Sequence, residues 1–171
     1  MQQRPPWLQD LVAGYLTGTA GTAAMTATTQ VQKRIRRHED IPVDYDATRH
    51  VVTAASAVVR YEPRTVFEEQ ALFLVAHWGY GSAVATAHRA LLRRTSSTRA
   101  AALFFVGCQS MAFVLLPVLG GTPPPWRWRR DIMVSSLAHH VVYVGAVVLA
   151  DRWLGPALSP EIDQLAGDAA S

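Results

Sequence analysis

Histidine and tyrosine recur one helical turn apart at two places in the sequence. His77 precedes Tyr80 by three residues, and His140 precedes Tyr143 by three, with His139 directly before the second pair. Residues three apart lie on one face of a helix, so each imidazole and phenol can share hydrogen-bonding partners. The repeated spacing also suggests a weak internal duplication of a two-helix unit.

Three roles for these histidines are open from the residues alone. They can fix a helical bundle through hydrogen bonds, or they can ligate the metal of a haem or chlorin through His77, His139 or His140. They can also join the tyrosines, Gln109 and nearby threonines in a path for protons or solute. We expect no carboxylate within any of the membrane spans described below, which disfavours a carboxylate-based ion pump.

Enzymatic chemistry finds little support in the sequence. Cys108 is the single cysteine and has no charged neighbour, so we expect an inert thiol and neither disulfides nor a multi-thiolate metal site. The sequence lacks a P-loop, an HExxH pair, a dinucleotide fingerprint and a G-x-S-x-G elbow. The polar cluster at residues 38–46 suits a solvated loop better than a metal site. We therefore predict no catalytic residue, no metal and no resident cofactor.

Three glycines give the first apolar stretch a smooth face. Gly14, Gly18 and Gly21 stand at positions i, i+4 and i+7, a spacing that lets another helix approach closely in a membrane. We expect this face to pack against helices of the same chain, with homodimerisation as the alternative.

The elements that must position these residues are predicted from the gaps between charged residues. Residues 11–32, 70–88, 100–126 and 132–150 contain no Asp, Glu, Lys or Arg. A bilayer core of about 30 Å needs about 20 helical residues. The pattern predicts an all-α integral membrane bundle of four transmembrane helices, about residues 9–32, 69–92, 99–119 and 131–153.

Composition favours the same conclusion, since 50% of the residues are hydrophobic and only 17% are charged. The basic residues cluster between apolar stretches, which is typical of membrane proteins rather than of nucleic-acid binding. A soluble bundle of fully buried helices is one alternative. A cleaved N-terminal signal peptide is another, but the first stretch is rich in threonine and only Arg4 precedes it.

The predicted organisation is a single domain, residues 1–155, followed by a flexible tail, residues 156–171. Within the long loop of residues 33–68, apolar residues recur at helical spacing from 45 to 61. We expect a short helix there, lying on the membrane surface or packed on the bundle. Ten Lys and Arg in the first and third loops, against six on the opposite side, favour a cytoplasmic first loop.

Short motifs lie in all four apolar stretches: GTAGTAAM at residues 18–25, AHWGYG at 76–81, Pro117 before a Gly/Pro-rich loop, and AHHVVY at 138–143. Together they resemble the YagU-like family of small, uncharacterised bacterial inner-membrane proteins. The chain departs from the family where Val144 intervenes before Gly145. The resemblance implies four membrane-spanning helices and a bacterial inner membrane, and it implies no activity, cofactor or site residue.

We therefore expect a non-enzymatic protein of the bacterial plasma membrane, whose partner is the lipid bilayer and not nucleic acid. The leading hypothesis is an accessory or scaffolding subunit that binds other membrane-protein subunits or itself. One alternative is a small transporter or channel that uses intramembrane His, Tyr and Thr. The other is a haem- or chlorin-binding protein.

Overall fold

The described part of the chain is helical and contains no strand. The computed structural model describes residues 6–35 and 47–158, which form α1 (Pro6–Ile35), α2 (Ala47–Val59), α3 (Val66–Leu92), α4 (Ser97–Leu119) and α5 (Arg130–Leu158), with a short 3₁₀ turn at Pro125–Arg127. The predicted all-α class is confirmed. The four long helices cover the four predicted stretches, and α2 lies where the short loop helix was expected. The predicted tail lies outside the described residues from residue 159 onward, as does the loop cluster of residues 38–46.

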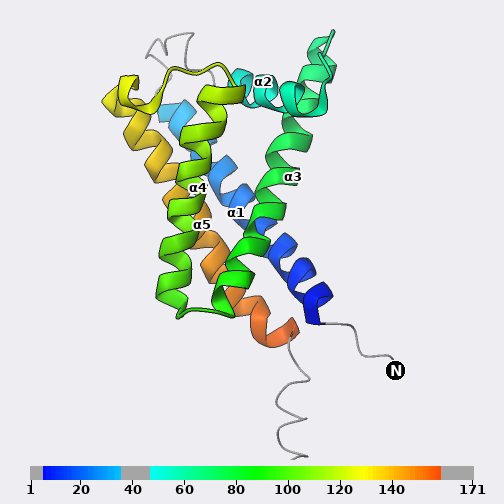
Figure 1. Ribbon diagram of the computed structural model, residues 1–171, viewed down its shortest axis with the longest axis vertical. Coiled ribbons are helices and arrows are strands. Elements are labelled where there is room, and N and C mark those ends of the chain that lie inside the picture. The colour runs from blue at the N-terminus through cyan, green and yellow to red at the C-terminus, as the bar shows by residue number, and fades with distance from the viewer. Residues whose placement is uncertain (1–5, 36–46, 159–171) are drawn as a thin grey trace, which may run out of the picture.

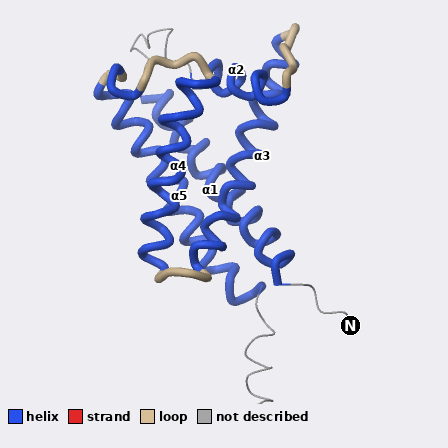
Figure 2. Tube along the Cα trace, in the orientation of Figure 1, coloured by secondary structure: helices blue, strands red, loops and turns tan. Residues whose placement is uncertain are grey.

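The four long helices run along the long axis of the molecule, and α2 lies across one end of it (Figure 1). Helices α3 and α5 both run away from the α2 end, whereas α1 and α4 run toward it. Helix α1 packs mainly against α3 and α5. The opposite end, called the base below, holds the start of α1, the turn between α3 and α4, and the end of α5 (Figures 1 and 2).

The start of α3 is defined by side chains that satisfy its first backbone N–H groups. The Thr65 hydroxyl accepts a hydrogen bond from the Glu68 N–H at 3.2 Å. The Glu68 carboxylate accepts one from the Arg64 N–H at 2.6 Å, which lowers the pKa of this carboxyl. A threonine followed three residues later by glutamate is a common N-terminal signal of helices, so this boundary follows from local sequence.

Helix α2 is fastened to the end of α4 by a buried histidine. The His50 ring nitrogen Nδ1 lies 2.7 Å from the Gly120 carbonyl oxygen, so it carries the proton and donates. A Cβ at Gly120 would come within 2.7 Å of the His50 carbonyl oxygen, so only glycine permits this approach. The next residue, Gly121, has a φ of +69°, which also favours glycine. His50 is therefore a packing residue and not an ordinary loop histidine.

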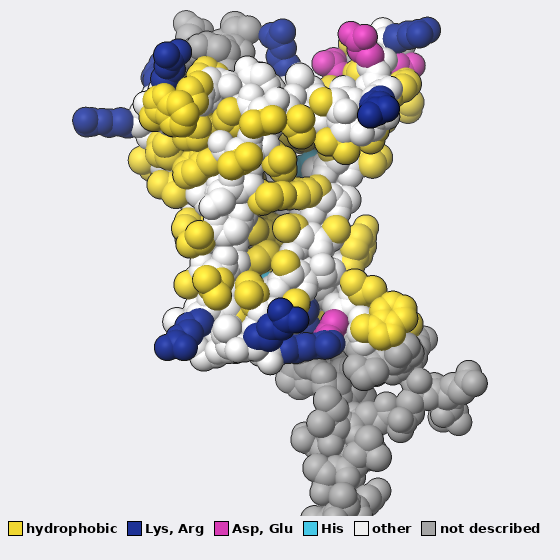
Figure 3. Space-filling model, viewed as in Figure 1, with side chains coloured by type: hydrophobic (Ala, Val, Ile, Leu, Met, Phe, Trp, Pro, Cys, Tyr) yellow, Lys and Arg dark blue, Asp and Glu magenta, His cyan; other side chains and the backbone are white. Residues whose placement is uncertain are grey.

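Within the described residues, two helices are long and apolar enough to cross a membrane: Ser97–Leu119, with a mean hydropathy of 2.1, and Arg130–Leu154, with 1.8. In each, only 17% of the most apolar segment is buried within the protein. On the face shown in Figure 3, charged side chains gather at the two ends, and apolar side chains cover the region between them.

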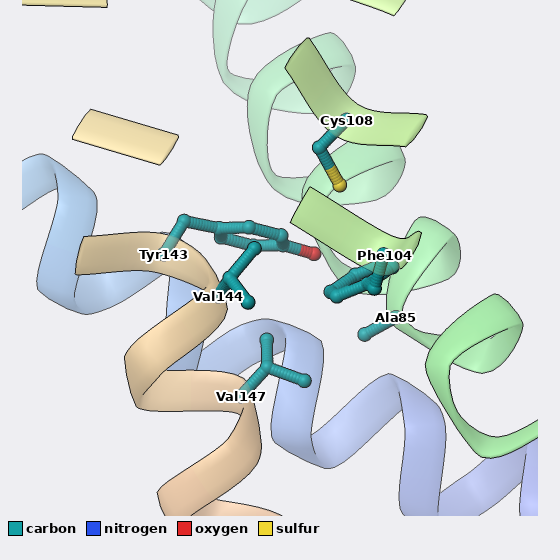
Figure 4. Close-up of a cluster of buried hydrophobic side chains, with 6 residues drawn as sticks. All are labelled: Ala85, Phe104, Cys108, Tyr143, Val144 and Val147. Carbon is teal, nitrogen blue, oxygen red and sulfur yellow. The ribbon is translucent and has the colours of Figure 1, made fainter. Parts of the chain in front are cut away.

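The apolar core lies where α3, α4 and α5 meet (Figure 4). Phe104 of α4 packs against Tyr143 of α5, with ring centroids 5.9 Å apart. Val147 and Ala85 are fully buried beside them, and the Cys108 thiol is buried in the same cluster. A small core leaves most apolar surface on the outside of the bundle.

Candidate functional site

The glycines of α1 bring its backbone against two other helices. A Cβ at Gly14 would lie 2.7 Å from the Thr86 Cα, and one at Gly18 would lie 2.4 Å from the Ser82 carbonyl oxygen, both in α3. A Cβ at Gly21 would meet the Tyr143 ring of α5 at 2.7 Å. The smooth face of α1 therefore packs against helices of the same chain. Gly14 and Gly18 lie against α3, and Gly21 lies against α5.

The threonines of α1 are satisfied by the helix itself. All six hydroxyls donate to the carbonyl oxygen three or four residues earlier, at 2.8–3.1 Å; they are those of Thr17, Thr19, Thr22, Thr26, Thr28 and Thr29. The oxygen of each hydroxyl can still accept a hydrogen bond from a neighbouring helix. The threonine hydroxyls of α1 therefore form a row of hydrogen-bond acceptors, and each hydroxyl proton already has a backbone carbonyl oxygen as its own acceptor.

A column of polar side chains follows this row, and we call it the polar spine. It consists of side chains of α1, α3 and α5 that pair across the bundle: Thr19, Thr26, Thr29, Gln32, His77, Ser82, Ser135 and His139. The Thr19 and Ser82 hydroxyl oxygens are 3.0 Å apart, and the Gln32 amide nitrogen lies 2.9 Å from the Ser135 hydroxyl. The polar spine joins α1 to both of its neighbours.

Two of the predicted histidines belong to the polar spine. His77 places Nε2 3.1 Å from the Thr26 hydroxyl. His139 places Nε2 3.2 Å from the Thr29 hydroxyl, while its Nδ1 lies 2.7 Å from the Ser135 carbonyl oxygen. Because Nδ1 donates to that carbonyl, Nε2 of a neutral His139 must accept the Thr29 proton, which the Met25 carbonyl also claims. One hydroxyl proton cannot be donated to both acceptors at once.

His140 and Gln109 lie beside the polar spine. The His140 Nδ1 lies 2.8 Å from the Ser136 carbonyl oxygen in its own helix. The Gln109 amide nitrogen donates to the Ser136 hydroxyl at 3.1 Å. The other amide atom of Gln109, Oε1, is buried without a hydrogen-bond partner. Ligation of a tetrapyrrole by His77 or His139 would have to displace the hydrogen bonds that their Nε2 atoms make to α1.

The two predicted tyrosines occupy different surroundings. Tyr143 is 4% exposed, and its hydroxyl donates to the Gly81 carbonyl oxygen at 2.5 Å, linking α5 to α3. Tyr80 is 47% exposed, so much of its side chain lies at the surface of the bundle. The two His–Tyr pairs are therefore not structurally equivalent, although their sequence spacing is the same.

Sequence reasoning missed a network of charged residues at the base, which we call the charged base: Asp10, His88, Arg89, Arg93 and Asp151. Asp151 of α5 accepts from the His88 Nδ1 at 2.6 Å and from Arg89 at 3.1 Å. Arg89 also donates to Asp10 of α1 at 3.2 Å, and Arg93 pairs with the same carboxylate. The network ties α1, α3 and α5 together where they converge.

Asp151 corrects the expectation that carboxylates stay outside the bundle. It is 7% exposed and lies one residue beyond the fourth charge-free stretch. Helical spacing offered a signal, since His88 follows His77, and Asp151 follows His140, by 11 residues or three turns. His88 is 1% exposed, and its Nε2 has no hydrogen-bond partner in the described residues. The Asp151 carboxylate therefore fixes the orientation of the His88 ring.

The polar spine and the charged base both fasten helices to one another, through hydrogen bonds and ion pairs. No group of three His, Cys, Asp or Glu in the described ranges is placed to hold a metal ion. Family models, curated proteins and solved structures were compared with the chain, and none of them matches it. Membership of the YagU-like family therefore stays a prediction.

Proposed function

We propose that the chain is a multi-pass protein of a bacterial plasma membrane, in which α1, α3, α4 and α5 all cross the bilayer. The observation that carries this proposal is the exposed apolar surface of α4 and α5. Only 17% of the most apolar segment of each helix is buried within the chain. The core helix of a soluble bundle would bury most of that surface, because water penalises its exposure.

Helices α1 and α3 are less apolar than α4 and α5, but polar side chains of the two helices pair with each other inside the bundle. The α1 hydroxyls donate to their own backbone, as a helix in a bilayer requires. The outer side of α1 exposes Leu11, Val12 and Leu16, and that of α3 exposes Leu74 and Val75. These observations support four spans, with the serines, threonines and histidines gathered inside.

Extraction of membranes with alkaline carbonate tests the membrane location. We expect the expressed protein to stay in the pellet and to dissolve only in detergent. Release into the soluble fraction as a folded protein would overturn the proposal.

Within the membrane, we assign the chain the role of an accessory or scaffolding subunit without catalytic activity. A shallow apolar depression between α4 and α5 supports this role; its lining residues are Ala101, Phe105, Val141, Val144, Gly145, Val148 and Leu149. Nothing in the described chain lies within 4 Å of a Cβ at Gly145. Small residues on an open helix face are typical of sites where another membrane helix packs.

A pair of glycine variants tests this role. Gly145→Leu fills the depression, whereas Gly107→Leu adds the same side chain to α4 at a position where a Cβ also meets nothing within 4 Å. We expect gently solubilised native membranes to yield a complex larger than the monomer, which Gly145→Leu dissociates and Gly107→Leu leaves intact. A protein that runs as a monomer in every gentle detergent would contradict the role.

A second candidate function is proton or polar-solute movement through the polar interior of the bundle. The open Nε2 of His88 and the unpartnered Oε1 of Gln109 favour it, because both are buried acceptors with no partner in the described residues. Vesicles containing the protein and a pH-sensitive dye should then dissipate an imposed pH gradient, and His88→Gln should abolish this. The absorption spectrum of the same preparation tests tetrapyrrole binding.

A further inference from the structure

A groove lies between α1 and α3 at the charged base, and it combines an apolar floor with guanidinium groups. Its lining includes Trp7, Leu11, Ala87, Ala90, Arg93 and Arg94. Leu11, Ala87 and Ala90 are all exposed along it. The groove is therefore open to whatever surrounds the bundle.

The charge of this region is positive after its ion pairs are formed. Arg89 and Arg93 already engage Asp10, and Arg89 also engages Asp151. Arg94 is exposed, and no described carboxylate pairs with it. Three arginines therefore face two carboxylates, and the surplus positive charge lies at the mouth of the groove.

The order of groups along the groove matches the order of groups along a phospholipid. Leu11, Ala87 and Ala90 lie about one helical turn nearer the middle of the molecule than Trp7, Arg93 and Arg94, as their positions in α1 and α3 require. The small alanine side chains leave room for an acyl chain. Trp7 is 60% exposed, and indoles favour the level of lipid headgroups.

We propose that this groove binds one anionic phospholipid, with its phosphate on Arg93 and Arg94 and an acyl chain along Leu11, Ala87 and Ala90. The proposal rests on the proposed membrane location. Guanidinium groups suit phosphate because they offer several N–H donors in one plane. The Asp10–Arg93 pair holds one of the two guanidiniums at the mouth, and Arg94 supplies the unbalanced charge.

Lipid binding to the purified protein in detergent tests the proposal. Phosphatidylglycerol, phosphatidylcholine and glycerol 1-phosphate are titrated separately, and bound molecules are counted by native mass spectrometry. Arg94→Gln removes the charge at the groove, and Arg99→Gln is the matched control, because Arg99 is exposed at the same end but does not line the groove. Ala90→Phe blocks the apolar floor without changing charge.

We expect one phosphatidylglycerol to bind in preference to phosphatidylcholine, and glycerol 1-phosphate not to compete. Arg94→Gln should weaken phosphatidylglycerol binding about fivefold, Ala90→Phe should also weaken it, and Arg99→Gln should leave it unchanged. Equal binding of both lipids, an equal loss in Arg94→Gln and Arg99→Gln, or competition by glycerol 1-phosphate would overturn the proposal. Because carbonate extraction tests membrane location separately, a membrane-integral protein with no lipid preference would refute the lipid site alone.

Discussion

Replacing Gly18 with alanine should destabilise the bundle, because the added methyl group has no space. A Cβ at this position would lie 2.4 Å from the Ser82 carbonyl oxygen and 2.7 Å from the Ser82 Cα. Ordinary contact begins at 3.4 Å, so α1 and α3 must separate by about 3.4 − 2.4 = 1.0 Å, and no rotamer change can relieve a clash with backbone. Overpacking of this kind costs about 1–3 kcal/mol. Alanine regains about 0.5–1 kcal/mol of helix propensity, so we expect a net loss of about 1–2 kcal/mol.

The assay is unfolding of the detergent-solubilised protein, followed by circular dichroism. Gly145→Ala is the matched control, because its Cβ would meet nothing within 4 Å. We expect this control to be as stable as the parent protein or slightly more stable, and Gly18→Leu to unfold more readily than Gly18→Ala. If Gly18→Ala and Gly145→Ala were equally stable, the close packing of α1 on α3 would be refuted.

Four further substitutions test the polar contacts by the same unfolding assay. Asp151→Ala should cost about 3 kcal/mol, because the buried His88 ring loses its carboxylate and Arg89 keeps only Asp10. A loss below about 1 kcal/mol would show that water reaches the charged base. Tyr143→Phe should cost about 1 kcal/mol through the lost hydrogen bond to Gly81, and no loss would mean that this bond does not form. His77→Leu should destabilise by about 1 kcal/mol for its bond to Thr26. His50→Leu should be at least as harmful, since its buried Nδ1 holds the end of α4, and a silent His50 variant would contradict that packing.

The helices could be predicted from the sequence because their signals are local. Charge-free stretches of about 20 residues and the proline-rich break after α4 can each be recognised within one continuous segment of the chain. The glycine face of α1 could also be predicted, because the spacing of its glycines indicates close packing against another helix. The sequence did not name its neighbours, and the structure places α3 against Gly18 and α5 against Gly21.

The polar contacts were decided by tertiary structure. His77 and His140 stand at similar depths in their helices, yet one bonds to a threonine of α1 and the other to its own backbone. Tyr80 and Tyr143 share a sequence motif but differ in exposure, at 47% and 4%.

The charged base shows most clearly what the sequence alone determined and what it left open. The sequence shows that charged residues bound the apolar stretches, and Asp10, Arg89 and Asp151 are three of them. They form one network only because α1, α3 and α5 converge at the base. Local propensity depends on neighbours in the chain, whereas pairing across helices depends on their rotation and relative height, which packing of the whole bundle sets.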